Sequence, residues 1–215
     1  MKGVQQERTI SDAFAQTRTG ETLVNMMALD MLVGSGGCLS HSPRRHQAAM
    51  MLIDAFQPEG ITRLAVDSIF MMPQLGVLST LHQKAATEVF EKDCLIHLGT
   101  CICPSGTGKP GVPCVKVAAD VASGQHVDVA LNFGEMHLIK ADVGEKVKVS
   151  IHPSKGFDVG AGPGKPMEAE VTGGVVGIVI DARGRPIQLP SDKPEGVRKL
   201  QEWHKALSVY PEYSF

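Results

Sequence analysis

The sequence predicts an α+β protein, and changes of pattern along the chain support this class. Up to residue 93, stretches with helical spacing of apolar residues alternate with short apolar runs, which is typical of helices and buried strands. From residue 94, short β-branched or alternating runs are separated by Gly/Pro clusters, which is typical of a small all-β unit. We therefore expect an α/β segment over 1–93, a β-rich domain over 94–192 and a C-terminal amphipathic helix over 193–215.

In the first segment, helices and strands are expected in alternation. A helix over 11–27 precedes the continuous apolar run "ALDMLVG", which predicts a covered strand. Ser42 as N-cap and Pro43 at the first helical position predict the start of the next helix. "ITRLAVDS" then predicts a strand, and the stretch 69–93 predicts a helix with Pro73 near its first turn or at a kink.

In the β-rich segment and the last helix, three stretches give specific expectations. "KVKVSIHP" predicts a strand with Val147, Val149 and Ile151 on one face. "DARGRP" predicts a tight reversal between strands at 178–180 and 187–189. The final helix is expected to carry one apolar stripe, formed by Val197, Leu200, Trp203 and Leu207.

The composition excludes several classes of partner. A net charge of −2 and a pI of about 6.4 give no electrostatic footprint for nucleic acid or an anionic membrane. No apolar run approaches the roughly 20 residues that span a bilayer, and the first 14 residues contain no secretory apolar region. Five cysteines, an odd number, fit a reducing compartment. We therefore expect a cytoplasmic protein with no nucleic-acid or membrane partner.

The stretch "MLVGSGGCLSH" at residues 31–41 is the main candidate for a binding site. Its glycines fit neither the dinucleotide-binding fingerprint nor the P-loop, and "GTGK" at 106–109 lacks the rest of a P-loop. A glycine turn between a strand and a helix nevertheless lets backbone approach a flat ligand, and amides at the helix start can face an anion. The alternative is that residues 34–37 form only a tight packing turn.

The longer string "VGSGGCLSHSPRRHQAAMMLIDAFQPEGITRLAVDSIFMMPQLGVLS" resembles a known family. It is similar to the C-terminal part of the MutL-like accessory proteins of coenzyme-B12-dependent glutamate mutase, which are unrelated to the mismatch-repair proteins of that name. The likeness covers roughly residues 10–80. Asp67, Gly76 and Leu78 match the family's closing strand and helix. The resemblance implies a partial lobe of the actin-like ATPase fold, which sugar kinases share.

The resemblance also implies a ligand and a role. In this family the glycine turn lies where the second ATPase lobe meets the adenosine of ATP, so ATP or ADP with magnesium is the implied cofactor. The residues implied as binding are Gly34, Ser35, Gly36, Gly37, Leu39 and His41. Such activator or reactivase proteins use ATP to release damaged cofactor from the mutase. The implied function is therefore an accessory, ATPase-like module.

The chain also departs from the family. The acidic, glycine-rich phosphate loops of the superfamily normally lie upstream, and this sequence has none. It contains no complete catalytic constellation, so ATPase activity is expected only with a missing lobe, which would come from a longer parent chain or from another polypeptide. The β-rich half lies outside the core ATPase fold, and we expect it to touch a partner such as the B12-dependent mutase. We also expect an oligomer.

Two alternatives come from other classes of protein. Soft ligands gather between residues 94 and 114, where they could hold zinc or iron in a metal- or thiol-dependent enzyme subunit. These residues are Cys94, His97, Cys101, Cys103 and Cys114. The paired C-x2-C knuckles of standard sites are absent, and buried cysteines explain the same run. The other alternative is a purely structural interaction module.

Overall fold

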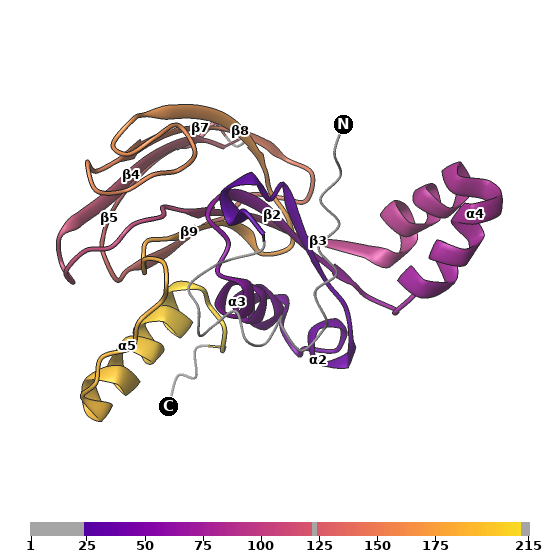
Figure 1. Ribbon diagram of the computed structural model, residues 1–215, viewed down its shortest axis with the longest axis horizontal. Coiled ribbons are helices and arrows are strands. Elements are labelled where there is room, and N and C mark those ends of the chain that lie inside the picture. The colour runs from indigo at the N-terminus through magenta and orange to yellow at the C-terminus, as the bar shows by residue number, and fades with distance from the viewer. Residues whose placement is uncertain (1–23, 122–123, 212–215) are drawn as a thin grey trace, which may run out of the picture.

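The computed structural model describes residues 24–121 and 124–211, and it confirms the α+β class. The elements form three layers, which are visible in Figure 1: a four-stranded sheet, a five-stranded sheet and a layer of helices. The helices α3 (Arg45–Phe56) and α5 (Lys193–Ala206) lie on the face of the five-stranded sheet that is turned away from the smaller sheet.

The five-stranded sheet is mixed and has the order β1-β2-β3-β9-β6. Its strands are β1 (Met31–Gly34), β2 (Gly60–Asp67), β3 (Leu95–Cys103), β9 (Gly177–Asp181) and β6 (Met136–Ile139). β1 and β2 run parallel, as do β3 and β9, while β2 pairs with β3 and β9 with β6 in antiparallel fashion. Strands from both sides of residue 94 therefore share one sheet, which joins the α/β segment to the β-rich segment.

The second sheet is antiparallel, with the order β5-β4-β7-β8. Its strands are β5 (His126–Asn132), β4 (Pro113–Asp120), β7 (Lys146–Pro153) and β8 (Met167–Thr172). Burial alternates along β7, where Val147, Val149 and Ile151 are fully buried, so the predicted one-sided strand is confirmed. These side chains meet those of β9 and β3, such as Ile178 and Ile102, in a core between the sheets.

A second core lies between the five-stranded sheet and the helices. Leu52 and Ile53 of α3 pack there with Leu98 of β3 and with Trp203 near the end of α5. Of the apolar stripe predicted for the last helix, Trp203 and Leu207 are buried and Leu200 is partly buried. Val197, at the start of the helix, is exposed. The stripe is thus confirmed only over its second half, where α5 reaches the sheet.

The start of α3 differs from the prediction. The helix begins at Arg45, with Arg44 as its N-cap, and not at Ser42–Pro43. The Ser42 hydroxyl donates to the carbonyl of Leu39, at the end of the short helix α2 (Gly37–Ser40). A helix end leaves carbonyls without intrahelical partners, and Ser42 satisfies one of them. The serine therefore closes α2 instead of opening α3.

The reversal predicted for "DARGRP" is also wrong in part. The chain does turn after β9, but residues 187–189 form no strand. The amide of Ile187 instead donates to the side-chain oxygen of Gln57, just past α3. The sequence pattern does not reveal this because it depends on burial: both arginines of the turn pair with Asp181, and Arg183 also pairs with Asp54, which holds the chain against α3.

The predicted helix over 11–27 falls mostly outside the described residues. Within them, Met26–Ala28 forms one turn of 3-10 helix, η1. No helix in residues 24–121 and 124–211 has the length and apolar character needed to cross a membrane.

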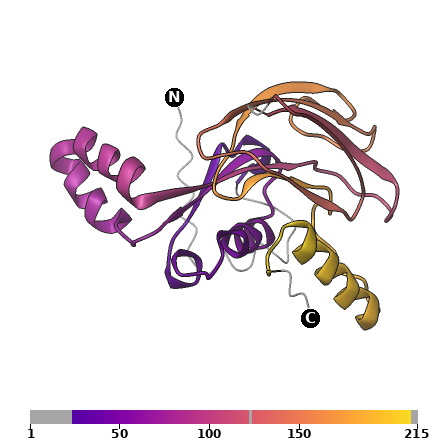
Figure 2. The ribbon, with the colours of Figure 1, turned by 180° about the vertical axis from the view of Figure 1, so that it is seen from behind.

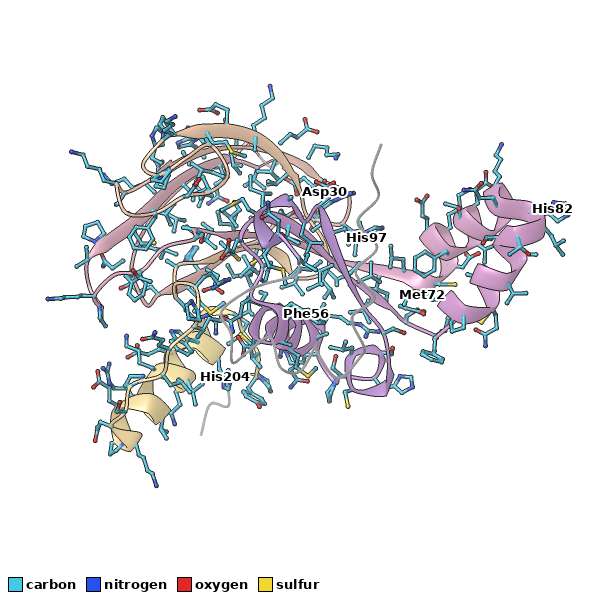
Figure 3. The ribbon with its side chains drawn as sticks, in the orientation of Figure 1. Asp30, Phe56, Met72, His82, His97 and His204 are labelled. Atoms are coloured by element: carbon cyan, nitrogen blue, oxygen red, sulfur yellow. The ribbon has the colours of Figure 1, made fainter. Side chains whose placement is uncertain are left out.

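The helix α4 (Met72–Val89) stands away from the sheets, as Figures 1 and 2 show from opposite sides. Pro73 lies in its first turn, as predicted, and the backbone at His82 is not helical, with φ −140° and ψ 73°. His82 therefore breaks the helix at its far end, while Met72 lies near the sheet (Figure 3). The single-turn π-helix η2 (Phe90–Cys94) returns the chain to β3. Apolar side chains on this projection are exposed, among them Ile69, Phe70, Val77 and Leu81.

Gly99 offers a test of the contact between the parallel strands β3 and β9. Its φ is +134°, and a Cβ atom there would collide with the carbonyl oxygen of Gly177. We expect Gly99→Ala to lower the free energy of unfolding by about 3 kcal/mol, from backbone strain and overpacking together. Gly76→Ala is the control, because Gly76 lies in α4 with open space around it, and alanine there should be neutral or stabilise by up to about 1 kcal/mol. Urea denaturation of both variants checks this, and equal effects would contradict it.

Candidate functional site

The glycine turn joins β1 to α2, and its glycines differ in their surroundings and backbone conformation. A Cβ atom on Gly34 would lie 2.6 Å from Leu39 Cδ1 and 2.8 Å from Leu52 Cδ2, so a side chain there would require both leucines to shift. Gly36 has a φ of 107°, which L-residues rarely adopt, and a Cβ atom on Gly36 or Gly37 would meet nothing within 4 Å. Gly34 is therefore explained by packing, whereas Gly36 and Gly37 face open space where a ligand could approach.

The other predicted residues of the turn are placed on both sides of it. Leu39 is partly buried and packs into the core beneath α3, so its role in the structure is to anchor α2. His41 follows α2 as its C-cap and is exposed. Ser35 lies within 3.5 Å of Asp67, measured between Oγ and Oδ2. Of the predicted residues, Gly37 and His41 line one pocket, whereas Ser35 lies beside Asp67 and Leu39 packs into the core.

Asp67, at the end of β2, holds the turn against the start of α4. Its carboxylate is fully buried and accepts hydrogen bonds from the backbone amides of Ile69, Met71 and Met72. Its backbone carbonyl accepts a hydrogen bond of 2.6 Å from the Ser40 hydroxyl, in α2. One residue therefore fixes two neighbouring loops at the carboxyl ends of the parallel strands β1 and β2, which is where ligands bind in open α/β sheets.

A pocket of about 500 Å³ adjoins the turn, within the range of small-molecule sites. The turn contributes Gly37, Cys38 and His41, and α3 contributes its outer face. The far wall comes from the end of α5 and the residues after it, including His204 and Tyr210. Figure 3 shows His204 on α5 beside α3. The α3 residues are Gln47, Met50, Met51 and Asp54.

Behind this pocket lies a buried network of charged groups around Asp181. The Asp181 carboxylate accepts hydrogen bonds of 2.9 and 3.0 Å from the Arg183 guanidinium and one of 3.0 Å from Arg185. Arg183 also forms an ion pair of 2.8 Å with Asp54 of α3, and its guanidinium carbon lies 5.0 Å from the centroid of the Trp203 ring. The network joins β9, α3 and α5, so it sets the relative positions of the pocket walls.

The charges in this network shift each other's pKa values. Burial alone would raise the pKa of Asp181, but the positive charges of Arg183 and Arg185 and the hydrogen bonds from Arg183 outweigh burial and lower it to about 2. Burial would lower the pKa of Arg183, and the carboxylates of Asp181 and Asp54 instead raise it. These groups therefore stay charged around neutral pH and act as a fixed scaffold.

A second cavity, of about 590 Å³, lies between the sheet and α4. It is lined by Met31 and Arg63 on the sheet, by His97 at the start of β3, and by Leu75 and Phe90 on the projection. The four-stranded sheet does not cover this part of the larger sheet (Figure 2). Among the described residues the cavity is therefore part of an open surface rather than an enclosed site.

The structure separates the five residues predicted as an alternative metal site. Cys101 and Cys103 come together, with their sulfurs 3.0 Å apart, in the core beneath α3. Cys94 belongs to the small cluster at the base of α4, His97 lines the second cavity, and Cys114 lies in the core between the sheets. Residues 24–121 and 124–211 contain no group of three or more His, Cys, Asp or Glu side chains that could hold a metal.

The thiols also lack the properties of reactive cysteines. Burial raises the pKa of Cys114 to about 12, and burial together with the Cys103 hydrogen bond raises that of Cys101. Thiolates, which are the reactive form, are therefore disfavoured at both positions. The described residues give no support to the metal- or thiol-dependent alternative.

Several residues of the pocket were missed from the sequence. For the network behind the pocket, an acidic residue two positions before an arginine in "DARGRP" is the one indication in the sequence of the local Asp181–Arg183 ion pair. Nothing in the sequence connects Asp54, His204 and Tyr210, because they are brought together only by the packing of α5 against α3.

Comparison with known proteins bears on the first segment. A family model described as "MutL protein" matches residues 3–94. The first segment of the chain is therefore MutL-like. This match supports a domain of the glutamate-mutase accessory type, as the resemblance implied, and it ends where β3 is about to begin. No curated protein and no solved structure matches the chain. The glycine turn, α3 and Asp67 all lie within the MutL-like segment, while Arg183, His204 and Tyr210 lie outside it.

Removal of the Asp67 carboxylate tests its role in holding the turn. Asp67→Ala would leave three backbone amides without their acceptor, and we expect the free energy of unfolding to fall by about 2–3 kcal/mol. Asp67→Asn keeps one acceptor oxygen and should lose about half as much. Urea denaturation, with amide hydrogen exchange at residues 69–72, measures both effects. Unchanged exchange at these amides in Asp67→Ala would contradict the assignment.

The low pKa of Asp181 predicts how stability depends on pH. The unfolded value is about 3.9 and the folded value about 2, so the stabilisation is present above pH 4 and is lost as pH falls from 4 to 2. The shift corresponds to about 2–3 kcal/mol. We expect the Asp181 carboxyl carbon, observed by NMR, to keep the chemical shift of a carboxylate at pH 3.5. A midpoint near 4 in the folded protein would contradict this prediction.

Proposed function

We propose that this chain is an accessory module of a coenzyme-B12-dependent mutase, related to the ATPase-like activators, and that its glycine turn takes the adenosine side of ATP or ADP. The observation that carries the proposal is the pair Gly36 and Gly37, which face open space beside a pocket of about 500 Å³ in the MutL-like segment. Glycines without a packing role, next to a pocket of ligand size, fit the close approach of a nucleoside.

The phosphates and magnesium would be held elsewhere. The Asp67 carboxylate, the buried acidic group nearest the turn, already accepts three amide hydrogen bonds, so we do not assign it to magnesium. The helix that follows the turn, α2, has only four residues and offers a weak dipole to phosphate. We therefore assign the phosphate contacts, and any ATP hydrolysis, to a second lobe from a longer parent chain or another polypeptide.

An uncovered surface is available for such a lobe. Within the described residues β1 pairs only with β2, so one edge of the larger sheet is open. Beside it lie the second cavity and the exposed apolar side chains of the projecting helix α4, including Val77 and Leu81. A strand edge next to exposed apolar surface is typical of an interaction site. We propose that the missing lobe packs here, which leaves the four-stranded sheet free to contact the mutase.

The five cysteines are free thiols in the structure, which fits our placement of this function in the reducing cytoplasm.

Calorimetric titration with ATP and ADP in the presence of magnesium tests the proposal. We expect wild-type protein to bind and Gly36→Val to lose at least about tenfold in affinity, because valine would fill the space the nucleoside needs. Gly111→Val is the matched control: Gly111 also has a positive φ, 84°, and open space around it, but it lies in the loop before β4. Equal binding by wild type and Gly36→Val, or loss in both variants, would contradict the site.

A further inference from the structure

The pocket beside the glycine turn is built by two distant parts of the chain. One side belongs to the MutL-like segment and consists of the turn and the outer face of α3. The other side belongs to the C-terminal residues, where His204 and Tyr210 line the pocket. A ligand that enters beside Gly37 would therefore contact both parts.

The α3 side of the pocket has an apolar middle and a polar group at each end. Gln47 and Asp54 are seven residues apart, which is about 10 Å along a helix, and Met50 and Met51 lie between them. Met50 is buried and Met51 is exposed, so the floor combines one packed thioether with one that can adapt to a ligand. The length and the apolar floor fit a planar heteroaromatic ring whose sugar lies toward Gly37.

Asp54 is held in place from behind. Its Oδ1 atom pairs with Arg183, which is fixed in turn by the buried Asp181. The side chain of Asp54 is 46% exposed, and its second oxygen has no hydrogen-bond donor among the described residues. The far end of the pocket therefore presents one oriented acceptor, suited to an amino group on the ring.

Tyr210 forms the opposite wall. Its ring meets the imidazole of His204 edge-on, with centroids 5.4 Å apart and an angle of 75° between the planes. Tyr210 is 58% exposed, and its hydroxyl makes no hydrogen bond within the described residues. An exposed aromatic ring that shares a pocket with methionine side chains is suited to stack on a nucleobase.

We propose that the C-terminal residues complete a base-recognition pocket, in which Tyr210 stacks on the base of an adenine nucleoside and Asp54 accepts a hydrogen bond from its 6-amino group. This inference rests on the proposed nucleotide function and extends it, because it assigns recognition of the base to residues from two distant parts of the chain. A 6-oxo purine would place a carbonyl oxygen against the Asp54 carboxylate and would be rejected.

Ligand-observed NMR titration of the whole chain with adenosine and inosine tests the inference without phosphates or magnesium. We expect adenosine to bind at least about tenfold more tightly than inosine, since inosine would place an acceptor against the Asp54 acceptor in the closed complex. Asp54→Asn should reduce this preference to about threefold or less, because an amide can donate to the 6-oxo group.

Tyr210→Ala should weaken both nucleosides by about tenfold, as expected for loss of one stacking partner. Phe56→Ala is its matched control, since Phe56 is a half-exposed aromatic residue of α3 that does not line the pocket. Circular dichroism and thermal unfolding establish that each variant is folded.

The outcomes separate this inference from the proposed function. If ATP binding depends on Gly36 but adenosine binding is unchanged in Tyr210→Ala and Asp54→Asn, the base pocket is overturned and the nucleotide turn stands. If Tyr210→Ala weakens adenosine binding while Gly36→Val leaves ATP binding unchanged, the pocket stands and the turn is overturned. Absence of adenosine binding up to millimolar concentrations overturns the base pocket, and absence of ATP binding as well overturns both.

Discussion

The arrangement of the whole molecule depends on the buried carboxylate of Asp181 and the two arginines that neutralise it. Removal of one partner from a buried ion pair costs about 3–5 kcal/mol, because it leaves an uncompensated charge in the interior. Here removal of Asp181 would also weaken other contacts of the two arginines. Arg183 contacts Asp54 and Trp203, and Arg185 donates to the carbonyl of Pro58. The strand β9, the end of α3 and the helix α5 are therefore held by a single set of charges.

This constraint makes the two halves of the chain one body. The larger sheet already crosses residue 94, and the ion network then fixes the helical layer to it. Trp203 adds a direct connection, because its indole nitrogen donates to the carbonyl of Gly134 while its ring lies against Arg183. A rigid relation between α3 and α5 is what a pocket with one wall on each helix requires, since small displacements would change its width. These charged groups therefore stabilise the fold and also fix the positions of the pocket walls.

The sequence predicted what depends on local periodicity and missed what depends on distant packing. The strands at residues 31–34, 60–67 and 146–153 followed from apolar runs and alternation, and the structure confirms them. Ser42 and Pro43 form a favourable local helix start, but the Ser42 hydroxyl instead donates a hydrogen bond to the carbonyl of Leu39 in α2. "DARGRP" has the composition of an exposed reversal, and only the burial of Asp181 makes its arginines interior groups. Tyr210 lies more than 150 residues from the turn, so no motif connects them.

The structure shows which glycines of the turn are required by packing or backbone conformation, which the sequence alone does not show. Taken together, four residues in "GSGG" fit either a packing turn or a ligand site. The structure divides them: Gly34 has Leu39 and Leu52 against the place where its Cβ would be, and Gly36 and Gly37 have nothing there. A turn selected for packing alone would need glycine at Gly34 and, because of its φ of 107°, at Gly36. Gly37 meets neither condition, since its φ is not positive and a Cβ atom there would meet nothing within 4 Å. A glycine that neither packing nor backbone conformation requires, in the lining of a pocket of ligand size, is a reason to expect a ligand at this turn.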